Sequence, residues 1–500
     1  MRILLINPPA QNTAIEYPDE KGDSYLETED FGVFPPLGLL YIIAYLEKHS
    51  PSHEIILKDC VAEKIPHTQL GKIVEEARPD VVGITSFTIS MADVVMAART
   101  VRKHAPNAHI CLGGHHPIAF PFEAAQLAEF DSIVVGEGET AFTALVDALE
   151  NKRDITAITG VYTGESIIRH RSSPSRDSRF LTNVMVPPAY IEDIDSLPFP
   201  ARAHVAHIDF HSIVGVSGRL ATIISSRGCP YRCTYCDVPY KRYRKRSIGN
   251  IVDEVEQCVA QGYKELHFYD DLFNITPGRV MEFCAEVEKR SLKFHWDFRG
   301  RVNSVTYESL EAAKKAGLRM ISFGVETGSD EGLAAIKKKT TTAKVREVFG
   351  WCRKLGILTI ADFMIGFPFE KDRDAIMRNV DFLISLDPDY AQFAVLTLYP
   401  NTELFNDAAR LGLINPSRWS AFSLDPRPGF MVDHWEEHMD IHELVRTQKE
   451  AYRKFYMRPS YIMRSALRLT SWYEAKAKAR GFLKLLGANP GRGRKAAAVD

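Results

Sequence analysis

Three cysteines stand close together in the segment SRGCPYRCTYCDVP, residues 226–239, with the spacing C-x3-C-x2-C. Three thiolates are too few to close a tetrahedral zinc site, and an odd number cannot all form disulfides. Thiolate is a soft ligand that suits both zinc and iron. Cys229, Cys233 and Cys236 therefore either hold three irons of a 4Fe-4S cluster and leave the fourth iron open to a ligand, or bind zinc with a distant histidine. Unligated thiols are the remaining alternative.

The rest of the composition is that of an ordinary globular protein. Of the 500 residues, 45% are hydrophobic and 25% charged, and the formal net charge is −2. No strong overall field therefore draws the chain to nucleic acid. The length predicts two or three domains. No stretch approaches the roughly 20 apolar residues of a transmembrane helix, and the apolar run near the N-terminus has the length of a strand rather than of a signal peptide.

The other five cysteines are scattered singly among apolar residues. They are predicted to be core thiols rather than a disulfide framework, which favours a reducing, cytoplasmic compartment. These cysteines are Cys60, Cys111, Cys258, Cys284 and Cys352.

Short apolar runs alternate with helical patterns over residues 1–165. This alternation predicts an α/β fold with a doubly wound, Rossmann-like parallel sheet. Ligands of such sheets bind beyond the carboxyl ends of the strands. The predicted strands are 2–7, 53–60, 80–87, 109–114 and 132–138, and the predicted helices are 36–49, 91–104 and 139–150.

A polar, proline-broken linker is predicted over 166–205, and the alternation of strand and helix then resumes over 206–430. Six repeats predict a partial (β/α)6 barrel, whose catalytic face lies at the strand carboxyl ends. The cysteines follow the first of these strands, so they lie on that face, which favours the cluster over zinc. The predicted strands are 221–226, 265–270, 294–300, 320–326, 359–368 and 390–400.

Residues 431–500 form a basic segment with a helical pattern. Two interpretations remain open for it. Its helices could cover the barrel or the cleft between the domains, or their mixed apolar and basic positions could lie on an anionic membrane as a peripheral contact.

The phrase CPYRCTYC, with Tyr235 before the last cysteine, resembles the radical S-adenosylmethionine (SAM) superfamily over about 220–415. The resemblance implies that the open iron binds SAM and that one electron cleaves it to a 5′-deoxyadenosyl radical. Asp270 and Asp271 occupy the place of the family's amino-group contact, although the family has Gly-Gly-Glu there. Glu326, in FGVETGS, matches the region that contacts ribose and carboxylate. The alternatives are a solvated turn or cap for the aspartates and a salt bridge inside the barrel for Glu326.

The phrases SFGVETGSDE and IGFP, together with the preceding domain, resemble the cobalamin-binding (class B) radical SAM enzymes. The resemblance implies cobalamin at the strand ends of the first domain, with its nucleotide tail in a slot lined by small residues. The signature D-x-H-x-x-G is absent, so we expect cobalt without a histidine ligand, and His115 and His116 as loop or tail contacts. The alternative is a Rossmann-like module without a corrin. Candidates for the slot are Thr85, Ser86, Gly113, Gly114, Gly136 and Glu137.

The resemblance implies methylation of an unactivated carbon, with one SAM used to methylate cobalt and another to form the radical. The strand ends of the two domains should then face each other, since close placement supplies much of the rate. No single residue must act as acid or base. Arg299 is expected to contact the SAM carboxylate and Arg301 an anionic substrate, unless they pair with Asp297 or Glu326. Substrate contacts are also expected from Tyr399 and Asn401 at the end of the sixth strand.

The sequence also bears on three other functions. A cyclase or rearrangement enzyme of the tetrapyrrole-cyclase type remains open. A tRNA methylthiotransferase would need three more cysteines before residue 200, where only Cys60 and Cys111 occur. A zinc-binding nucleic-acid module is disfavoured by the near-neutral charge. The expected partners are a small-molecule substrate and an external one-electron reductant of flavodoxin or ferredoxin type, with no nucleic acid.

Overall fold

The computed structural model describes residues 1–17, 32–170, 186–212, 215 and 219–467. The N-terminal part holds a sheet in the order β3-β1-β4-β5-β6-β7, in which every strand is parallel except β7. The strand order reverses between β1 and β4. This topological switch point is where doubly wound sheets open a crevice for a ligand. The strands are β1 Arg2–Asn7, β3 Glu54–Asp59, β4 Val81–Ser86, β5 His109–Gly114, β6 Ser132–Val134 and β7 Val161–Tyr162.

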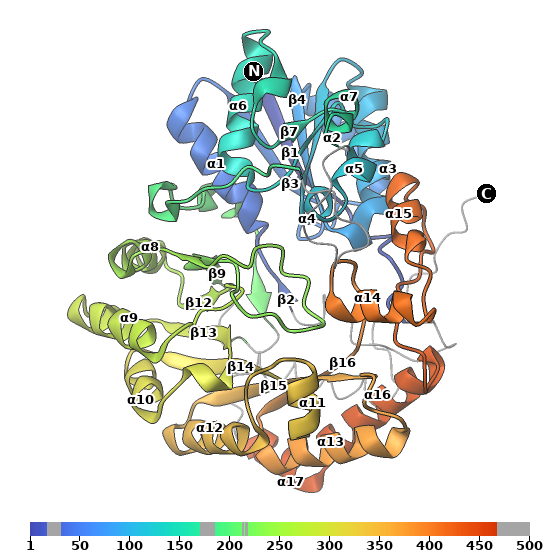
Figure 1. Ribbon diagram of the computed structural model, residues 1–500. Helices are drawn as coiled ribbons and strands as arrows, with labels where there is room; N and C mark the ends of the chain where they lie inside the picture. Colours follow the sequence, from blue (N-terminus) through green and yellow to red (C-terminus); the bar gives the residue numbers. More distant parts are fainter. Residues whose placement is uncertain (18–31, 171–185, 213–214, 216–218, 468–500) are drawn as a thin grey trace.

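Helices cover both faces of this sheet, as expected for a doubly wound fold (Figure 1). Ile3 and Leu5 of β1 pack in one core with α1 (Leu37–His49) and α6 (Gly138–Glu150). Leu4 and Ile6 point to the opposite face, into a core with α2 (His67–Ala77), α3 (Met91–His104) and α5 (Pro121–Gln126). Because both faces are buried, β1 is a continuous apolar run.

The second sheet has six parallel strands in the order β16-β15-β14-β13-β12-β9. Its edge strands are β9 and β16, so the strands form a partial barrel that does not close. The strands are β9 Leu220–Ile223, β12 Glu265–Phe268, β13 His295–Gly300, β14 Leu318–Glu326, β15 Leu358–Ile365 and β16 Tyr390–Val395. The helices between successive strands are α8 Ile248–Ala260, α9 Pro277–Lys289, α10 Tyr307–Lys315, α11 Asp330–Ala335, α12 Thr342–Leu355 and α13 Arg373–Leu386.

Several elements were not predicted from the sequence. The helix α2, the antiparallel strand β7 and the short pair β2 (Gly32–Val33) with β8 (His211–Ser212) are among them. Another short pair, β10 (Ser226–Arg227) with β11 (Arg244–Lys245), brackets the three cysteines. The further helices are α4 His115–Ala119, α7 Gly164–Ile168, α14 Glu403–Arg410 and α15 Ser417–Leu424.

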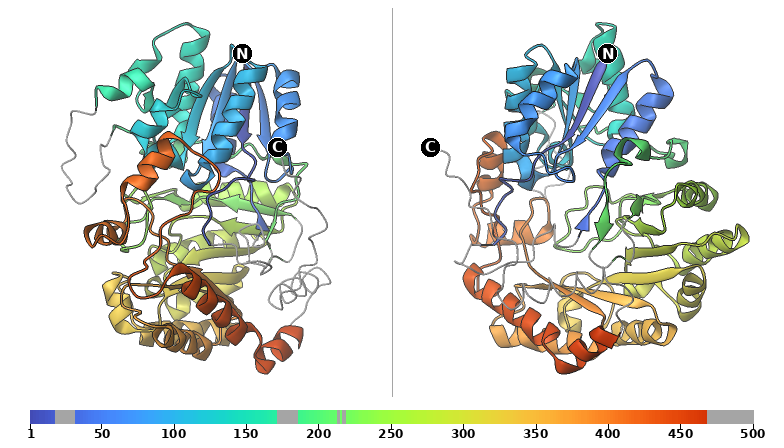
Figure 2. Two further views of the ribbon diagram at one scale, coloured as in Figure 1. Left: turned by 90° about the vertical axis from the view of Figure 1, so that its right-hand side faces the viewer. Right: turned by 180° about the vertical axis from the view of Figure 1, so that it is seen from behind.

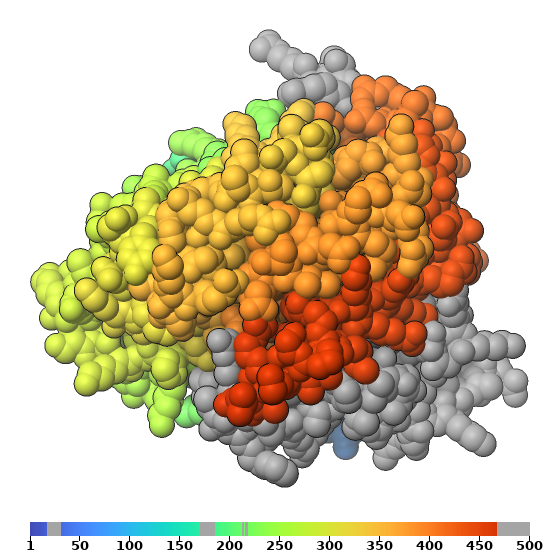
Figure 3. Space-filling model, turned by 90° about the horizontal axis from the view of Figure 1, so that it is seen from below, coloured from blue at the N-terminus to red at the C-terminus, as the bar shows by residue number. Residues whose placement is uncertain are grey.

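The helix α16 (Ile441–Tyr456) covers the edge of the barrel that is formed by β16. The hydroxyls of Tyr452 and Tyr456 bond backbone groups of Phe393 and Ala391 in β16. An unpaired strand edge is thereby satisfied. Figure 3 shows α16 and α17 (Pro459–Leu467) in red beside the orange helices of the barrel. Within the described residues, no helix is both long and apolar enough to cross a bilayer.

Candidate active site

The three cysteines lie in the cysteine loop, residues 228–243, which the pair β10–β11 closes at its base. The loop begins with a backbone turn that only glycine fits. Gly228 has a φ of +82°, and a Cβ there would lie 2.4 Å from the carbonyl oxygen of Arg242. The next amide, of Cys229, donates to the carbonyl of Tyr240 over 3.0 Å. The chain thus folds back on itself at the first cysteine. The N-terminal sheet and the barrel lie one above the other, with green segments of the chain between them (Figure 2).

The exposure of the thiols separates this trio from the other cysteines. Cys229, Cys233 and Cys236 are partly exposed, whereas the other five are buried. Tetrahedral zinc with bonds of about 2.3 Å needs sulfurs about 3.8 Å apart. Among the described residues, one group of three ligating side chains has all its ligand atoms within 4.8 Å of one another, and it consists of His53, Asp147 and Glu150 rather than the three cysteines. Sulfurs spread more widely along one accessible loop fit a multi-iron cluster better than a single zinc ion.

The two aspartates after β12 fasten the start of the cysteine loop. Asp270 is buried and accepts hydrogen bonds from the Ser225 amide, the Ser225 hydroxyl and the Ser226 hydroxyl. Burial raises its pKa to about 6, and the serine hydrogen bonds partly offset this. Asp271 accepts the amide of Gly228 over 3.0 Å. The aspartates therefore hold the loop that carries the cysteines, and contact with SAM remains a prediction for both.

Glu326 lies at the end of β14 in a strained backbone conformation. Its φ is +69°, and the pairing of β14 with β15 shifts register between Gly324 and Glu326. The resulting bulge aims its carboxylate under the cysteine loop, where Oε1 accepts from the Tyr235 hydroxyl at 2.9 Å and from Lys338 Nζ at 2.6 Å. Lys338 Nζ also lies 3.0 Å from the Tyr235 hydroxyl. Strain of this kind gathers at functional sites, where the surrounding structure holds it in place.

Arg299 and Arg301 differ in exposure and in contacts although they are only two residues apart. Arg299 is exposed, and its positive charge partly offsets the burial that raises the pKa of Asp362. Arg301 is buried, with Nη1 3.4 Å from the sulfur of Cys233. Neither pairs with Asp297, whose described partner is His267. The two arginines therefore do not form one clamp.

A cavity of about 750 Å³, here called the interdomain cavity, lies between the carboxyl ends of both sets of strands. Phe87, after β4, and His115, after β5, line it from the first domain. Cys236 lines it from the cysteine loop, and Tyr399 and Asn401 line it from the segment after β16. Asn401 has a φ of +69°. Two of the three predicted substrate residues, Tyr399 and Asn401, therefore share a cavity with Cys236 and the strand ends of the first domain, whereas Arg301 does not line it.

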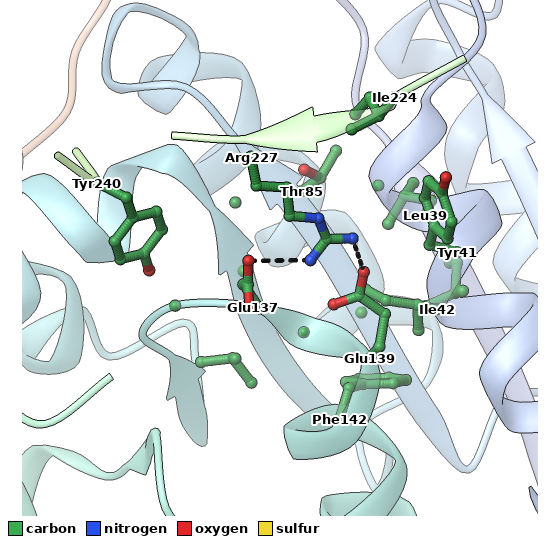
Figure 4. A pocket seen from close by; sticks show the side chains of 18 of the residues that line it. Leu39, Tyr41, Ile42, Thr85, Glu137, Glu139, Phe142, Ile224, Arg227 and Tyr240 are labelled. Atoms are coloured by element: carbon green, nitrogen blue, oxygen red, sulfur yellow. Dashed lines mark hydrogen bonds and ion pairs between the residues drawn. The ribbon is translucent and has the colours of Figure 1, made fainter. Parts of the chain in front are cut away.

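A second cavity of about 310 Å³, here called the slot, enters the first domain between α1 and α6 (Figure 4). Thr85, Gly113, Gly114, Gly136 and Glu137 all line it, which places five of the six predicted slot residues around one space. The sixth, Ser86, is buried and donates its hydroxyl to the carbonyl of Gly113 over 2.7 Å.

The three glycines that the sequence predicted for the slot serve different purposes. A Cβ on Gly113 would meet no atom within 4 Å, so this position opens into free space. Gly114 and Gly136 have φ of +95° and +108°, and a Cβ on either would lie within 2.5 Å of a backbone atom. These two glycines are explained by the backbone alone, whereas Gly113 is the position where a side chain would take room from a ligand.

Glu137 joins the slot to the cysteine loop. Arg244 donates two hydrogen bonds of 2.8 Å to the Glu137 carboxylate. Arg227 Nη1 lies 3.0 Å from Oε1 of Glu137, and Arg227 also pairs with Glu139 (Figure 4). Burial alone would raise the pKa of Glu137, but Arg244 and Arg227 outweigh it, so the pKa lies below its usual range. Both arginines flank the cysteine loop, so this buried network fixes the loop against the first domain.

The two histidines of GGHHP differ in their surroundings. His115 lines the interdomain cavity, 4.0 Å from a carboxylate oxygen of Asp237. His116 is buried, with Nδ1 3.1 Å from the Thr88 hydroxyl, and burial lowers its pKa to about 3. His116 does not line either cavity.

Three residues of the site were missed by the sequence analysis. Lys338 gave no signal, because it stands in a run of lysines that reads as a solvated turn. Arg227 and Arg244 flank the cysteine motif, and their position beside it was the only available clue.

Comparisons with known proteins agree with this geometry. Residues 223–379 match the Radical SAM superfamily, and residues 28–146 match the B12 binding domain. The chain is 27% identical to "Uncharacterized methyltransferase PH0819" of Pyrococcus horikoshii, over 93% of this chain and 94% of that protein. It is 24% identical to the anaerobic magnesium-protoporphyrin IX monomethyl ester cyclase of Rubrivivax gelatinosus, over 92% and 78%.

The fold is also found in a solved structure. The cobalamin-dependent S-adenosylmethionine radical enzyme OxsB, with aqua-cobalamin and S-adenosylmethionine bound, aligns with a TM-score of 0.66 at 16% identity, over 97% of this chain and 71% of that one. A region that matches the B12 binding domain is thus followed by a region that matches the Radical SAM superfamily and carries the three cysteines, in a fold that is shared with OxsB.

Proposed function

We propose that this protein is a cobalamin-dependent radical SAM methyltransferase that acts on an unactivated carbon of a small molecule. The observation that carries the proposal is the interdomain cavity, which Cys236 and the strand ends of the first domain line together. A reaction that uses two cofactors in turn needs its substrate within reach of both. The likeness to the methyltransferase PH0819 along nearly the whole chain supports the same reaction class.

The roles of the residues follow from their positions. Cys229, Cys233 and Cys236 would hold a 4Fe-4S cluster, and the slot around Gly113 would take the cobalamin tail. When bound, these groups supply one-electron cleavage of SAM and transfer of a methyl group. Tyr235, Lys338 and Glu326 form a polar group under the cysteine loop that would position SAM.

The remaining site residues would bind and orient rather than move protons. Asp270 and Asp271 hold the loop, and Arg299 is proposed to contact SAM. Thr85, Ser86, Gly114, Gly136 and Glu137 would shape the cobalamin site. Tyr399 and Asn401, with the apolar wall of Trp419 and Phe120 in the same cavity, would enclose the substrate and exclude water.

A cyclase is the second candidate. The cyclase of Rubrivivax gelatinosus aligns over 92% of this chain at 24% identity, which supports cyclisation as the alternative reaction. The two reactions differ in their use of SAM, since only methyl transfer consumes SAM as a methyl donor.

The products of SAM separate these candidates. The chain is to be reconstituted anaerobically with iron, sulfide and cobalamin, then supplied with SAM and a one-electron reductant. We expect S-adenosylhomocysteine together with 5′-deoxyadenosine. The deoxyadenosine alone would support the cyclase, and the absence of both would overturn the assignment of either reaction.

Partners and location are further parts of the proposal. The electron would come from a flavodoxin or ferredoxin in the cytoplasm, where reduced thiols persist. A peripheral membrane contact is proposed for α17, because it exposes Ile462, Met463 and Leu467 beside the partly exposed Arg464. Binding to anionic vesicles should be lost when these three apolar residues become serine, and unchanged binding would refute this contact.

A further inference from the structure

The side chain of Arg301 is buried against the cysteine loop. Its exposed fraction is 7%, and its Nη1 donates to the sulfur of Cys233 over 3.4 Å. The backbone beneath it is fixed, because the Asn274 side chain accepts the amide of Arg301 and donates to its carbonyl. Gly300 makes this possible, since a Cβ there would lie 2.6 Å from Oδ1 of Asn274.

The guanidinium is held on all sides. Nη2 donates to the carbonyl of Lys338, and Nε donates to Oδ1 of Asn303 over 3.3 Å. The ring of Tyr231 lies 3.9 Å from the guanidinium carbon and stacks on its face. The donor that faces Cys233 therefore has little freedom to turn elsewhere.

This buried cation has no carboxylate partner. Among the residues that the structure describes, no carboxylate oxygen lies within 4.0 Å of Arg301, whereas three of the other four buried arginines, Arg202, Arg244 and Arg246, are paired with glutamates. Arg279, also buried, instead bonds backbone carbonyls. Buried charges are costly unless an opposite charge compensates them. For Arg301, the acceptor in place is a cysteine sulfur, which becomes anionic when it ligates iron.

We propose that Arg301 sets the reduction potential of the cluster, as a positioning residue that acts through Cys233. This inference rests on the proposed function, because it requires the cluster on the three cysteines. When the external flavodoxin- or ferredoxin-type reductant passes one electron to the cluster, the cluster gains negative charge and no bond forms or breaks. A fixed cationic donor on a ligating sulfur stabilises the reduced state over the oxidised one. Arg301 therefore makes the first electron transfer easier, rather than clamping an anionic substrate.

The test is a redox titration of the reconstituted cluster, followed by electron paramagnetic resonance without SAM or cobalamin. In Arg301→Gln we expect the equilibrium constant for reduction to fall at least tenfold, which lowers the midpoint by 59 mV or more for one electron. Arg301→Lys keeps the positive charge but loses the forked guanidinium, so its midpoint should lie between those of Arg301→Gln and the unaltered chain. The matched control is Arg232→Gln, which removes an exposed positive charge beside Cys233 and should shift the midpoint by less than a third as much.

The outcomes separate this inference from the function itself. An unchanged midpoint in both Arg301 variants, with normal iron content, overturns the role of Arg301 and leaves the function standing. Loss of the cluster in both variants also overturns it, because Arg301 would then be needed for assembly. If the unaltered chain binds no cluster, the proposed function fails instead.

Discussion

Lys338 Nζ and Glu326 Oε1 lie 2.6 Å apart inside the barrel, and Tyr235 from the cysteine loop completes the group with bonds to both. All three side chains are at least partly buried. Burial raises the pKa of Tyr235 well above its usual value, and the carboxylate of Glu326 adds to this rise, so the phenol remains a donor. The group joins the end of β14 to the loop that carries the cysteines.

Gly324 leaves the room that this ion pair needs. A Cβ at this position would lie 2.5 Å from Glu326 Oε1 and 2.8 Å from Lys338 Nζ. We therefore expect Gly324→Ala to weaken SAM binding at least tenfold in the reconstituted enzyme, measured by equilibrium dialysis. Gly350→Ala in α12 meets no atom within 4 Å and should leave SAM binding unaltered. Equal affinity in both variants would argue against a SAM site at Glu326.

Removal of the Arg244 side chain should lower the free energy of unfolding, because Arg244 links the cysteine loop to Glu137 of the first domain. Arg244→Met leaves Glu137 buried with half of its cationic partners gone, and breaking a buried pair in this way costs about 3–5 kcal/mol. Arg242→Met is the control, because both side chains of the Arg242–Glu192 pair are exposed and an exposed pair is worth about 0–1 kcal/mol. Urea unfolding should show the difference. A similar small loss in both variants would mean that the network does not stabilise the fold.

A bulky residue at position 113 should block the slot. In Gly113→Leu, the new side chain enters space that is empty of protein atoms, and we expect cobalamin affinity to fall at least tenfold while iron content stays the same. Gly350→Leu provides the matched control. The measurement is the amount of cobalamin that stays bound after gel filtration, read from its visible absorbance. Normal retention in Gly113→Leu would mean that cobalamin binds elsewhere.

The cysteines should divide into two groups by their effect on iron. Cys233→Ala should abolish the cluster absorbance and the cleavage of SAM, because one iron loses its protein ligand. Cys352→Ala changes a buried core thiol and should keep both. Iron and sulfide analysis of the anaerobic protein measures the difference. Zinc in place of iron, or full turnover by Cys233→Ala, would contradict the cluster.

Glu370 should make stability fall as pH rises. It accepts the amides of Gly366 and Phe367 and the side chain of Asn379, and burial raises its pKa from 4.5 to about 7. Between these values the folded chain holds a proton that the unfolded chain has lost, so the folded state loses about 1–3 kcal/mol as pH rises through this window.

The variant Glu370→Gln tests this sign. It should unfold with a weaker dependence on pH between about 5 and 8 than the unaltered chain, as seen in thermal melts at several pH values. Glu403→Gln removes an exposed carboxylate of α14 and should keep the original slope. A slope unchanged by Glu370→Gln would mean that this carboxyl titrates normally.

Much of the fold follows from periodicity along the chain. The apolar runs beginning near residues 2, 81 and 109 are strands within one or two residues of prediction, because most residues of these strands are buried on both faces. The helix α2 was missed because its apolar stripe is narrow. The strand β7 was missed because its two residues pair only through contacts made in the folded sheet.

The sequence by itself indicated which metal chemistry the cysteine loop can support, because ligand type and spacing are local properties of a motif. It also indicated the alternation of strands and helices that builds both sheets, although α2, β7 and several shorter elements were missed. Only the tertiary structure decided which charges meet. Glu137 finds Arg244 across 107 residues, and Arg301 finds Cys233 across 68. Such pairs depend on which strand ends come together in the folded chain and on the exclusion of water from the space between them. Neither can be read from the residues that are neighbours in the sequence.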